Sequence, residues 1–244
     1  MKLALRHETH YSYDSPVRYS AQYLRLTPRD TARQKVIEWQ LETPGQPVRT
    51  VDGYGNVLHV LTLDKPVSEI VIRAFGVVQT ARDEDTPSDF TGVPLSPMLF
   101  LRATPLTRAD DKVEALAEKH RAGAGTPEGL RALAAAAKAH AGTSGPEAMV
   151  HVFLAACRRL GVPARYVSGY VLGEKKSGAV LTHAWAEAWV GDRWKSFDIA
   201  RDATVGEGHV KIAVGADYND ACPIRGMRTG GGLESMNAVA RLEQ

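Results

Sequence analysis

The chain contains only two cysteines, Cys157 and Cys222, and this number limits the thiol chemistry that it can perform. Two thiols cannot build the disulfide framework of a small secreted domain or a zinc site made mainly of thiolates. A cysteine nucleophile needs a lowered thiol pKa, which a helix N-terminus or a neighbouring imidazolium provides. A catalytic role for either thiol therefore depends on where it lies relative to helix starts and histidines.

The segment before Cys157 has the pattern of a helix start. Ser144 and Glu147 have the S-x-x-E spacing of a capping box, and Pro146 occupies an early helical position. The helix is expected to end at Gly161, and the Ser144 hydroxyl is then a cap bound to backbone N–H groups. Cys157 lies about three turns into this helix, where a small thiol is typical of core packing.

Other polar groups give no sign of a metal or cofactor site. His7, His10 and His59 lack the carboxylate spacing that is typical of metal ligands. The glycines at 230–232 lack the strand-then-helix setting of a phosphate-binding loop. The sequence therefore predicts a protein without a metal or a cofactor.

Two structural regions must position these residues. Residues 1–80 alternate apolar and polar side chains and predict an antiparallel β-sandwich, with strands at 3–13, 22–27, 34–43, 57–64 and 69–78. Residues 81–106 contain several prolines and predict a linker that packs on the surface. Residues 107–244 predict an α/β domain, with helices at 108–121 and 126–140 and strands at 164–172, 182–190 and 193–198. The overall fold class is then α+β.

Composition excludes several classes of protein. The formal net charge is +2 over 244 residues, which is too small to favour a nucleic acid or an anionic membrane as partner. Charged residues interrupt the N-terminal segment, and no apolar run reaches the roughly 20 residues of a membrane helix. We therefore expect a cytoplasmic protein.

Several segments resemble the bacterial transglutaminase-like family. In the second half they are Val152-Phe-Leu-Ala-Ala-Cys-Arg-Arg-Leu-Gly-Val-Pro-Ala-Arg-Tyr-Val-Ser-Gly-Tyr170, Thr182-His-Ala-Trp-Ala-Glu-Ala-Trp189 and Trp194-Lys-Ser-Phe-Asp198. The first 80 residues look like the β-sandwich that precedes the catalytic domain in this family, and residues 214–226 match its closing segment.

The resemblance implies a papain-like α/β core with a Cys-His-Asp triad. His183 and Asp198 stand where the family places its base and the acid that orients it. The two residues lie on predicted strands joined by a turn at residues 191–192, so a hydrogen bond between them is expected. Trp185 shares a face with His183 by its period-two spacing and is expected to shield the imidazole or to contact a ligand.

The nucleophile that the resemblance implies is missing. Alignment without gaps through the helix puts Pro146 at the position of the family's cysteine, and the chain has no cysteine before Cys157. The loop that usually precedes the nucleophile is also shortened, to residues 140–145.

These departures predict a catalytically inactive homologue that binds a peptide or protein, or pairs with an active relative or an operon-partner enzyme. The alternative is an active peptidase, amidase or acyl-transfer enzyme that uses Ser144 or Cys157 with His183 and Asp198.

Overall fold

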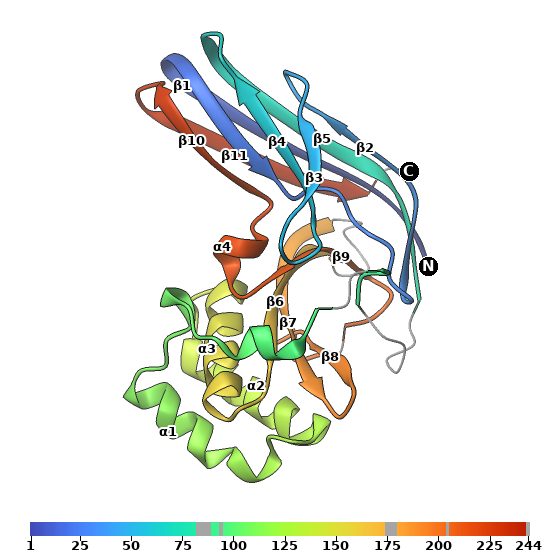
Figure 1. Cartoon of the computed structure of the whole chain (residues 1–244), viewed down its shortest axis with the longest axis vertical. Coiled ribbons are helices and arrows are strands. Elements are labelled where there is room, and N and C mark those ends of the chain that lie inside the picture. The colour runs from blue at the N-terminus through green and yellow to red at the C-terminus, as the bar shows by residue number, and fades with distance from the viewer. Residues whose placement is uncertain (82–88, 93–94, 174–179, 204, 243–244) are drawn as a thin grey trace.

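The chain forms a strand-rich upper part and a lower sheet covered by helices, as the computed structural model in Figure 1 shows. The structure describes residues 1–81, 89–92, 95–173, 180–203 and 205–242. No helix in these ranges is long and apolar enough to cross a membrane.

The strand-rich upper part is organised around one long strand, β1 (Lys2–Leu24). Its first half pairs with β5 (Val67–Thr80) and β11 (Glu234–Leu242), while its second half pairs with β4 (Val57–Leu63) and β10 (Ile224–Gly230). The pairing with β5 shifts register between Ser12 and Val17. The outer strands are β2 (Gln34–Glu42) beside β5 and β3 (Val48–Val51) beside β4. Strand β1 therefore links two antiparallel layers, β2-β5-β1-β11 and β3-β4-β1-β10.

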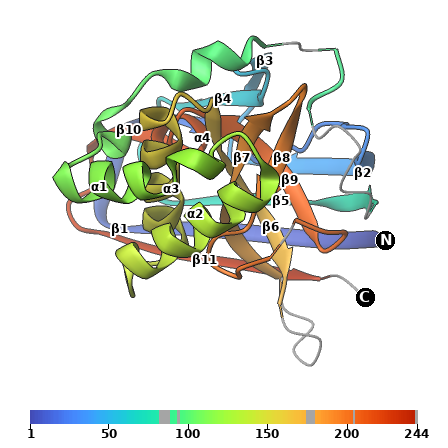
Figure 2. The ribbon, with the colours of Figure 1, turned by 90° about the horizontal axis from the view of Figure 1, so that it is seen from below.

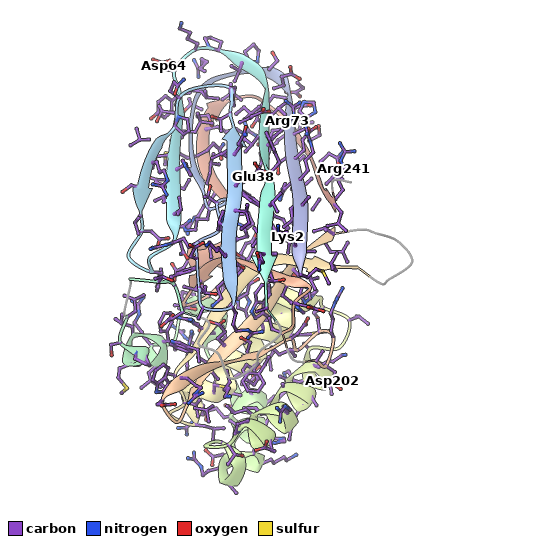
Figure 3. All side chains as sticks on the ribbon, turned by 90° about the vertical axis from the view of Figure 1, so that its right-hand side faces the viewer. Lys2, Glu38, Asp64, Arg73, Asp202 and Arg241 are labelled. Carbon is purple, nitrogen blue, oxygen red and sulfur yellow. The ribbon has the colours of Figure 1, made fainter. Side chains whose placement is uncertain are left out.

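The predicted sandwich has its own apolar core. Ile70 and Ile72 of β5 and Leu61 of β4 are fully buried in one cluster with residues of β1. The alternate residues of β5 face outward, where Arg73 pairs with Glu8 at 2.6 Å. Figure 3 shows Glu38 and Arg73 along this outer side. The alternation that the sequence predicted thus separates core from solvent.

The lower sheet has the strand order β8-β7-β6-β9, and all its neighbouring strands are antiparallel. Its strands are β6 (Ala164–Leu172), β7 (Val180–Val190), β8 (Arg193–Phe197) and β9 (His209–Gly215). Helices α1 (Asp111–Lys119), α2 (Pro127–Ala141) and α3 (Pro146–Arg159) cover it, as Figure 2 shows from below. Phe153 and Leu154 of α3 are fully buried between these layers.

The C-terminal strands depart from the predicted two-part division. Both β10 and β11 lie inside the range 107–244, yet they pair with β1 and complete the sandwich. The short helix α4 (Tyr218–Ala221) connects β9 to β10. The sequence placed these strands in the second region because hydrophobic alternation identifies a strand but not its distant partner.

The predicted surface linker is partly buried. Of its residues 81–106, positions 82–88 and 93–94 lie outside the described part of the chain. Two 3₁₀ helices, η1 (Pro97–Leu101) and η2 (Pro105–Thr107), bracket its end, and a third, η3 (Arg121–Gly123), follows α1. Phe100 is fully buried and packs edge-on against Trp194. The buried Arg158 of α3 donates hydrogen bonds to the Phe100 carbonyl and to the Thr107 hydroxyl. This segment is therefore a packed part of the fold.

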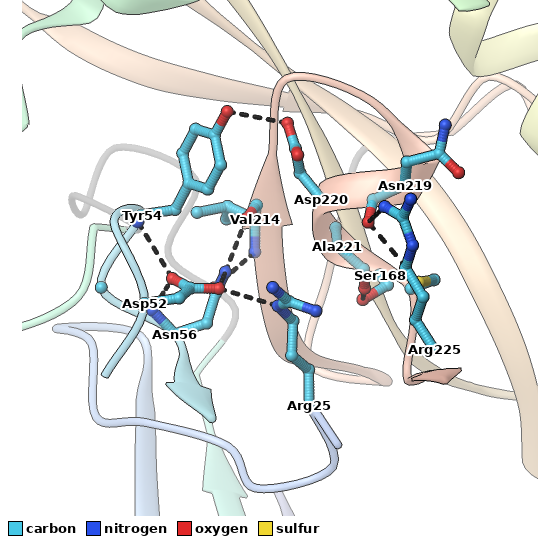
Figure 4. A network of polar contacts seen from close by, with 12 residues as sticks. Arg25, Asp52, Tyr54, Asn56, Ser168, Val214, Asn219, Asp220, Ala221 and Arg225 are labelled. Carbon is cyan, nitrogen blue, oxygen red and sulfur yellow. Dashed lines mark hydrogen bonds and ion pairs between the residues drawn. The ribbon is translucent and has the colours of Figure 1, made fainter. Parts of the chain in front are cut away.

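Two buried side-chain amides connect the sandwich to the lower sheet at the edge strand β9. The Asn56 amide donates to the Val214 carbonyl and accepts from the Val214 N–H, both at 2.8 Å. Gln34 makes the same pair of bonds to Lys211, at 2.9 and 2.8 Å. Figure 4 shows Asn56 beside Val214, with Asp52 accepting from both Asn56 and Arg25. These amides replace a neighbouring strand at the edge of the sheet.

Removing either amide is expected to weaken the whole chain. Asn56→Ala leaves a backbone N–H and a carbonyl buried without partners, so the free energy of unfolding should fall by about 1–3 kcal/mol, and Gln34→Ala should do the same. Urea denaturation measures both. The exposed Gln40 of β2 provides the control, because Gln40→Ala should change stability by less than about 0.5 kcal/mol. Equal losses in Asn56→Ala and Gln40→Ala would contradict the role of β9 as the junction.

Candidate functional site

The structure brings His183 and Asp198 together. His183 lies on β7, and Asp198 follows the last residue of β8 directly. The tight turn between the strands contains Gly191 at a φ of 66°, a conformation that glycine adopts at little cost. The distance from His183 Nε2 to Asp198 Oδ1 is 2.9 Å, and both side chains are buried. The carboxylate accepts this hydrogen bond, so Nε2 carries the proton.

A second histidine, His209, binds the other oxygen of the same carboxylate. Its Nε2 lies 3.0 Å from Asp198 Oδ2, while its Nδ1 accepts a hydrogen bond from the Gly206 N–H. The sequence analysis did not identify His209. Residues 209–215 alternate apolar side chains as a strand does, and this signal predicts β9, but it does not predict that the first residue of β9 faces Asp198.

The two imidazoles determine the charge state of Asp198. Burial alone would raise the pKa of this carboxyl, but hydrogen bonds from His183 and His209 outweigh that effect and hold the pKa well below its ordinary value. The Arg201 N–H also donates to Oδ1 at 3.2 Å. Asp198 therefore stays ionised and fixes the orientation and tautomer of both rings.

The same three residues are the described ones that could hold a metal ion. Their ligand atoms all lie within 4.8 Å of one another. Two imidazoles and one carboxylate form a donor set that transition metals use. Each Nε2 already faces the carboxylate, so an ion would have to replace both hydrogen bonds. The three side chains thus form a hydrogen-bonded group in which Asp198 orients the imidazoles of His183 and His209.

Trp185 lies beside both imidazoles and is almost completely buried. Its ring stacks on His183 at 6.4 Å between centroids and meets His209 edge-on at 5.4 Å. The indole therefore covers the rings from the protein interior. Trp189, further along β7, packs instead on Trp194.

His183 also lines an open pocket of about 180 Å³ between the sandwich and the lower sheet, which we call the His183 pocket. Strands β1, β6, β7 and β11 and the starts of α3 and α4 contribute to it. Its lining residues are His7, Thr9, Tyr11, Glu147, Tyr166, Ser168, Gly169, Thr182, His183, Tyr218, Pro223, Ile224, Met236 and Ala238.

The start of α3 reaches this pocket without a nucleophile. The helix begins at Pro146, and Glu147 of its first turn lines the His183 pocket. The predicted capping box at Ser144 is wrong: Gly145, at a φ of 88°, is the N-cap and no side chain caps the helix. Because the helix starts one residue later than the capping box requires, Ser144 is exposed and lies outside the pocket lining.

Neither thiol reaches His183. Cys157 is fully buried in the core under α3, and burial raises its thiol pKa above the ordinary value. Cys222 follows α4, and burial raises its thiol pKa as well. Both are therefore neutral thiols inside the protein and are unsuited to act as nucleophiles.

One wall of the pocket contains a buried histidine with consequences for acid stability. His7 Nδ1 lies 2.6 Å from the Tyr170 hydroxyl and Nε2 lies 2.9 Å from Thr9 Oγ1. Burial lowers the pKa of His7 from 6.5 to about 4. The unfolded chain therefore binds more protons than the folded chain between these two pH values, and stability falls as the pH is lowered through this window.

The variant His7→Gln tests this linkage. It keeps polar atoms at the site but cannot titrate. When the pH is lowered from 6.5 to 4, the free energy of unfolding of the parent should therefore fall by roughly 3 kcal/mol more than that of the variant. Urea denaturation across this pH range gives the comparison. His10→Gln removes an exposed imidazole from the same strand and serves as the control. Parallel stability curves for His7→Gln and the parent would show that His7 is not buried as the neutral form.

Comparisons with known proteins match both regions of the chain. The family model of the bacterial transglutaminase-like N-terminal region matches residues 3–79, and that of the transglutaminase-like superfamily matches residues 103–199. The chain is 29% identical over 279 residues to the uncharacterised protein ML0607 of Mycobacterium leprae, which covers 99% of this chain and 98% of that protein. It is 24% identical over 270 residues to Rv2569c of Mycobacterium tuberculosis, across 91% of this chain and 85% of that protein.

A solved structure shares the fold. A proposed cysteine protease from Cytophaga hutchinsonii superposes with a TM-score of 0.73 at 20% identity, and the match covers 100% of this chain and 91% of that chain. Because the two family models match residues 3–79 and 103–199, the chain belongs to the bacterial transglutaminase-like family, with the family's N-terminal region followed by a transglutaminase-like core.

Proposed function

We propose that this protein is a transglutaminase-like protein without thiol catalysis, and that it binds an extended segment of a peptide or protein in the His183 pocket. The observation that carries the proposal is which residues stand at the start of α3. The resemblance to the family puts Pro146 at the position of the nucleophile. Glu147 and His183 line the same pocket, and Cys157 is buried in the core.

The retained histidine and aspartate are compatible with a binding protein. Asp198 is a buried carboxylate with an imidazole on each oxygen, and removing one partner from such a group leaves a buried charge without compensation. His183 and His209 therefore have a structural reason to remain in a chain that has no nucleophile. This reason does not depend on proton transfer to a substrate.

The edge of strand β11 beside the pocket favours an extended chain as ligand. Strand β11 borders it through Met236 and Ala238, and among the described strands β11 pairs only with β1. Its other edge offers backbone N–H and carbonyl groups to an added strand. A bound segment could pair with that edge and place a side chain in the pocket.

The first test concerns the thiols. Cys157 and Cys222 should not react with iodoacetamide at neutral pH in the folded protein, because burial raises both thiol pKa values. Mass spectrometry after timed labelling gives the extent of alkylation. The same protein in urea is the positive control and should label at both positions. Fast alkylation of Cys157 in the folded protein would support the alternative enzyme instead.

The second test concerns binding. Peptides selected from a phage-displayed random library should bind the full chain with Kd values in roughly the micromolar range. Ala238→Trp fills the His183 pocket from β11 and should weaken binding at least about tenfold, measured by fluorescence anisotropy. Val239→Trp, on the same strand outside the pocket lining, is the matched control and should leave binding unchanged.

Two outcomes would contradict the proposal. One is a selection that yields no peptide whose binding Ala238→Trp reduces. The other is turnover of amide substrates that is lost in His183→Ala, because this result would identify the imidazole as a working base.

A further inference from the structure

The charge of the His183 pocket comes from a single side chain. Of the lining residues, only Glu147 belongs to the Asp, Glu, Lys and Arg group. Its side chain is exposed, and it takes part in none of the ion pairs formed by the described residues. Among the described lining residues there is no Lys or Arg to neutralise this carboxylate.

The negative charge of Glu147 affects the neighbouring tyrosines. Burial raises the pKa of Tyr166, and the charges of Glu147 and Asp217 raise it further. Burial and the charge of Glu147 also raise the pKa of Tyr218. The charge of Glu147 therefore acts on both hydroxyls of this wall of the pocket.

Two polar groups of the pocket can accept hydrogen bonds from a ligand. The Ser168 hydroxyl donates its proton to the Ala221 carbonyl at 2.5 Å, which leaves only lone pairs for a ligand. The Glu147 carboxylate is the second acceptor. A ligand with several N–H donors suits these two groups.

Aromatic side chains complete the lining of the pocket. Tyr166 and Tyr218 lie with their ring centroids 6.1 Å apart and their planes at 77°. Tyr11 of β1 contributes a third phenol from the sandwich side. Aromatic faces attract cations, and a planar guanidinium stacks on them better than an ammonium does.

We propose that the His183 pocket binds the guanidinium of an arginine side chain, with Glu147 as its counter-ion and the tyrosines as its walls. This inference rests on the proposed peptide-binding function and names the side chain that the bound segment places in the pocket. A guanidinium carries five N–H donors and no acceptor, which matches the acceptor oxygens of Glu147 and Ser168. Its positive charge complements the Glu147 carboxylate.

The test titrates the full chain, labelled with ¹⁵N, with three blocked peptides that differ in one side chain. These are Ac-Gly-Arg-Gly-NH₂, the citrulline peptide of nearly the same shape without the charge, and the corresponding lysine peptide. The arginine peptide should shift the amide signals of Ser168 and His183 saturably at millimolar concentration. The citrulline peptide should bind at least about tenfold more weakly, because charge-assisted hydrogen bonds to the carboxylate are lost.

The variant Glu147→Gln isolates the counter-ion. It should weaken the arginine peptide about tenfold and leave the citrulline peptide unchanged. The exposed Glu128 of α2, which pairs only with Arg131 among the described residues, provides the matched control Glu128→Gln, and this change should have no effect on either peptide. A thermal melt of each variant verifies that it is folded.

The outcomes separate this inference from the function on which it rests. Library peptides that bind in the pocket without an arginine, or equal affinity for the arginine and citrulline peptides, would overturn the guanidinium assignment and leave peptide binding intact. Equal or tighter binding of the lysine peptide would also overturn it, since the assignment is to a guanidinium. Absence of binding by every peptide would overturn both proposals.

Discussion

The edge of strand β9 is the constraint on which the arrangement of this protein depends. An edge strand in the interior would leave backbone N–H and carbonyl groups without partners, and each such group costs about 1–3 kcal/mol. Gln34 and Asn56 each satisfy one N–H and one carbonyl of β9, at Lys211 and Val214. Because both amides come from the sandwich, its position relative to the lower sheet is determined by the register of β9.

The site follows from the same register. His209 is the first residue of β9, and its position brings Nε2 to Asp198 on the side of the carboxylate opposite His183. The His183 pocket is bounded on one side by β1 and β11 and on the other by β6 and β7, so it also lies between the sandwich and the lower sheet. The two imidazoles on Asp198 and the pocket therefore both depend on the lower sheet and its neighbours.

Sequence reasoning identified contacts between residues that are close in the sequence and missed contacts between residues that are far apart in it. The strand at Ala164–Leu172 matches its predicted bounds, and the hydrogen bond between His183 and Asp198 follows from a hairpin with a short turn. His209 and the strands β10 and β11 were missed because their partners lie far away in the chain, at Asp198 and on β1. Alternation of apolar residues identifies a strand, but it carries no information about which strand is its neighbour. The capping box failed for another reason: Gly145, at positive φ, is the N-cap, so the helix begins at Pro146, one residue later than the capping box requires.

The first turn of α3 places a carboxylate at the N-terminus of the helix. A helix N-terminus carries partial positive charge, which stabilises an anion placed beside it. No side chain caps α3, and the carboxylate of Glu147 lies in its first turn, so the anion at this end is now a carboxylate. The helix dipole acts on this group as it would on a thiolate, but a carboxylate is a weaker nucleophile and a stronger hydrogen-bond acceptor. A helix N-terminus that stabilises an anion is thus compatible with Glu147 as the charged group of the pocket, on which the proposed binding of a guanidinium rests.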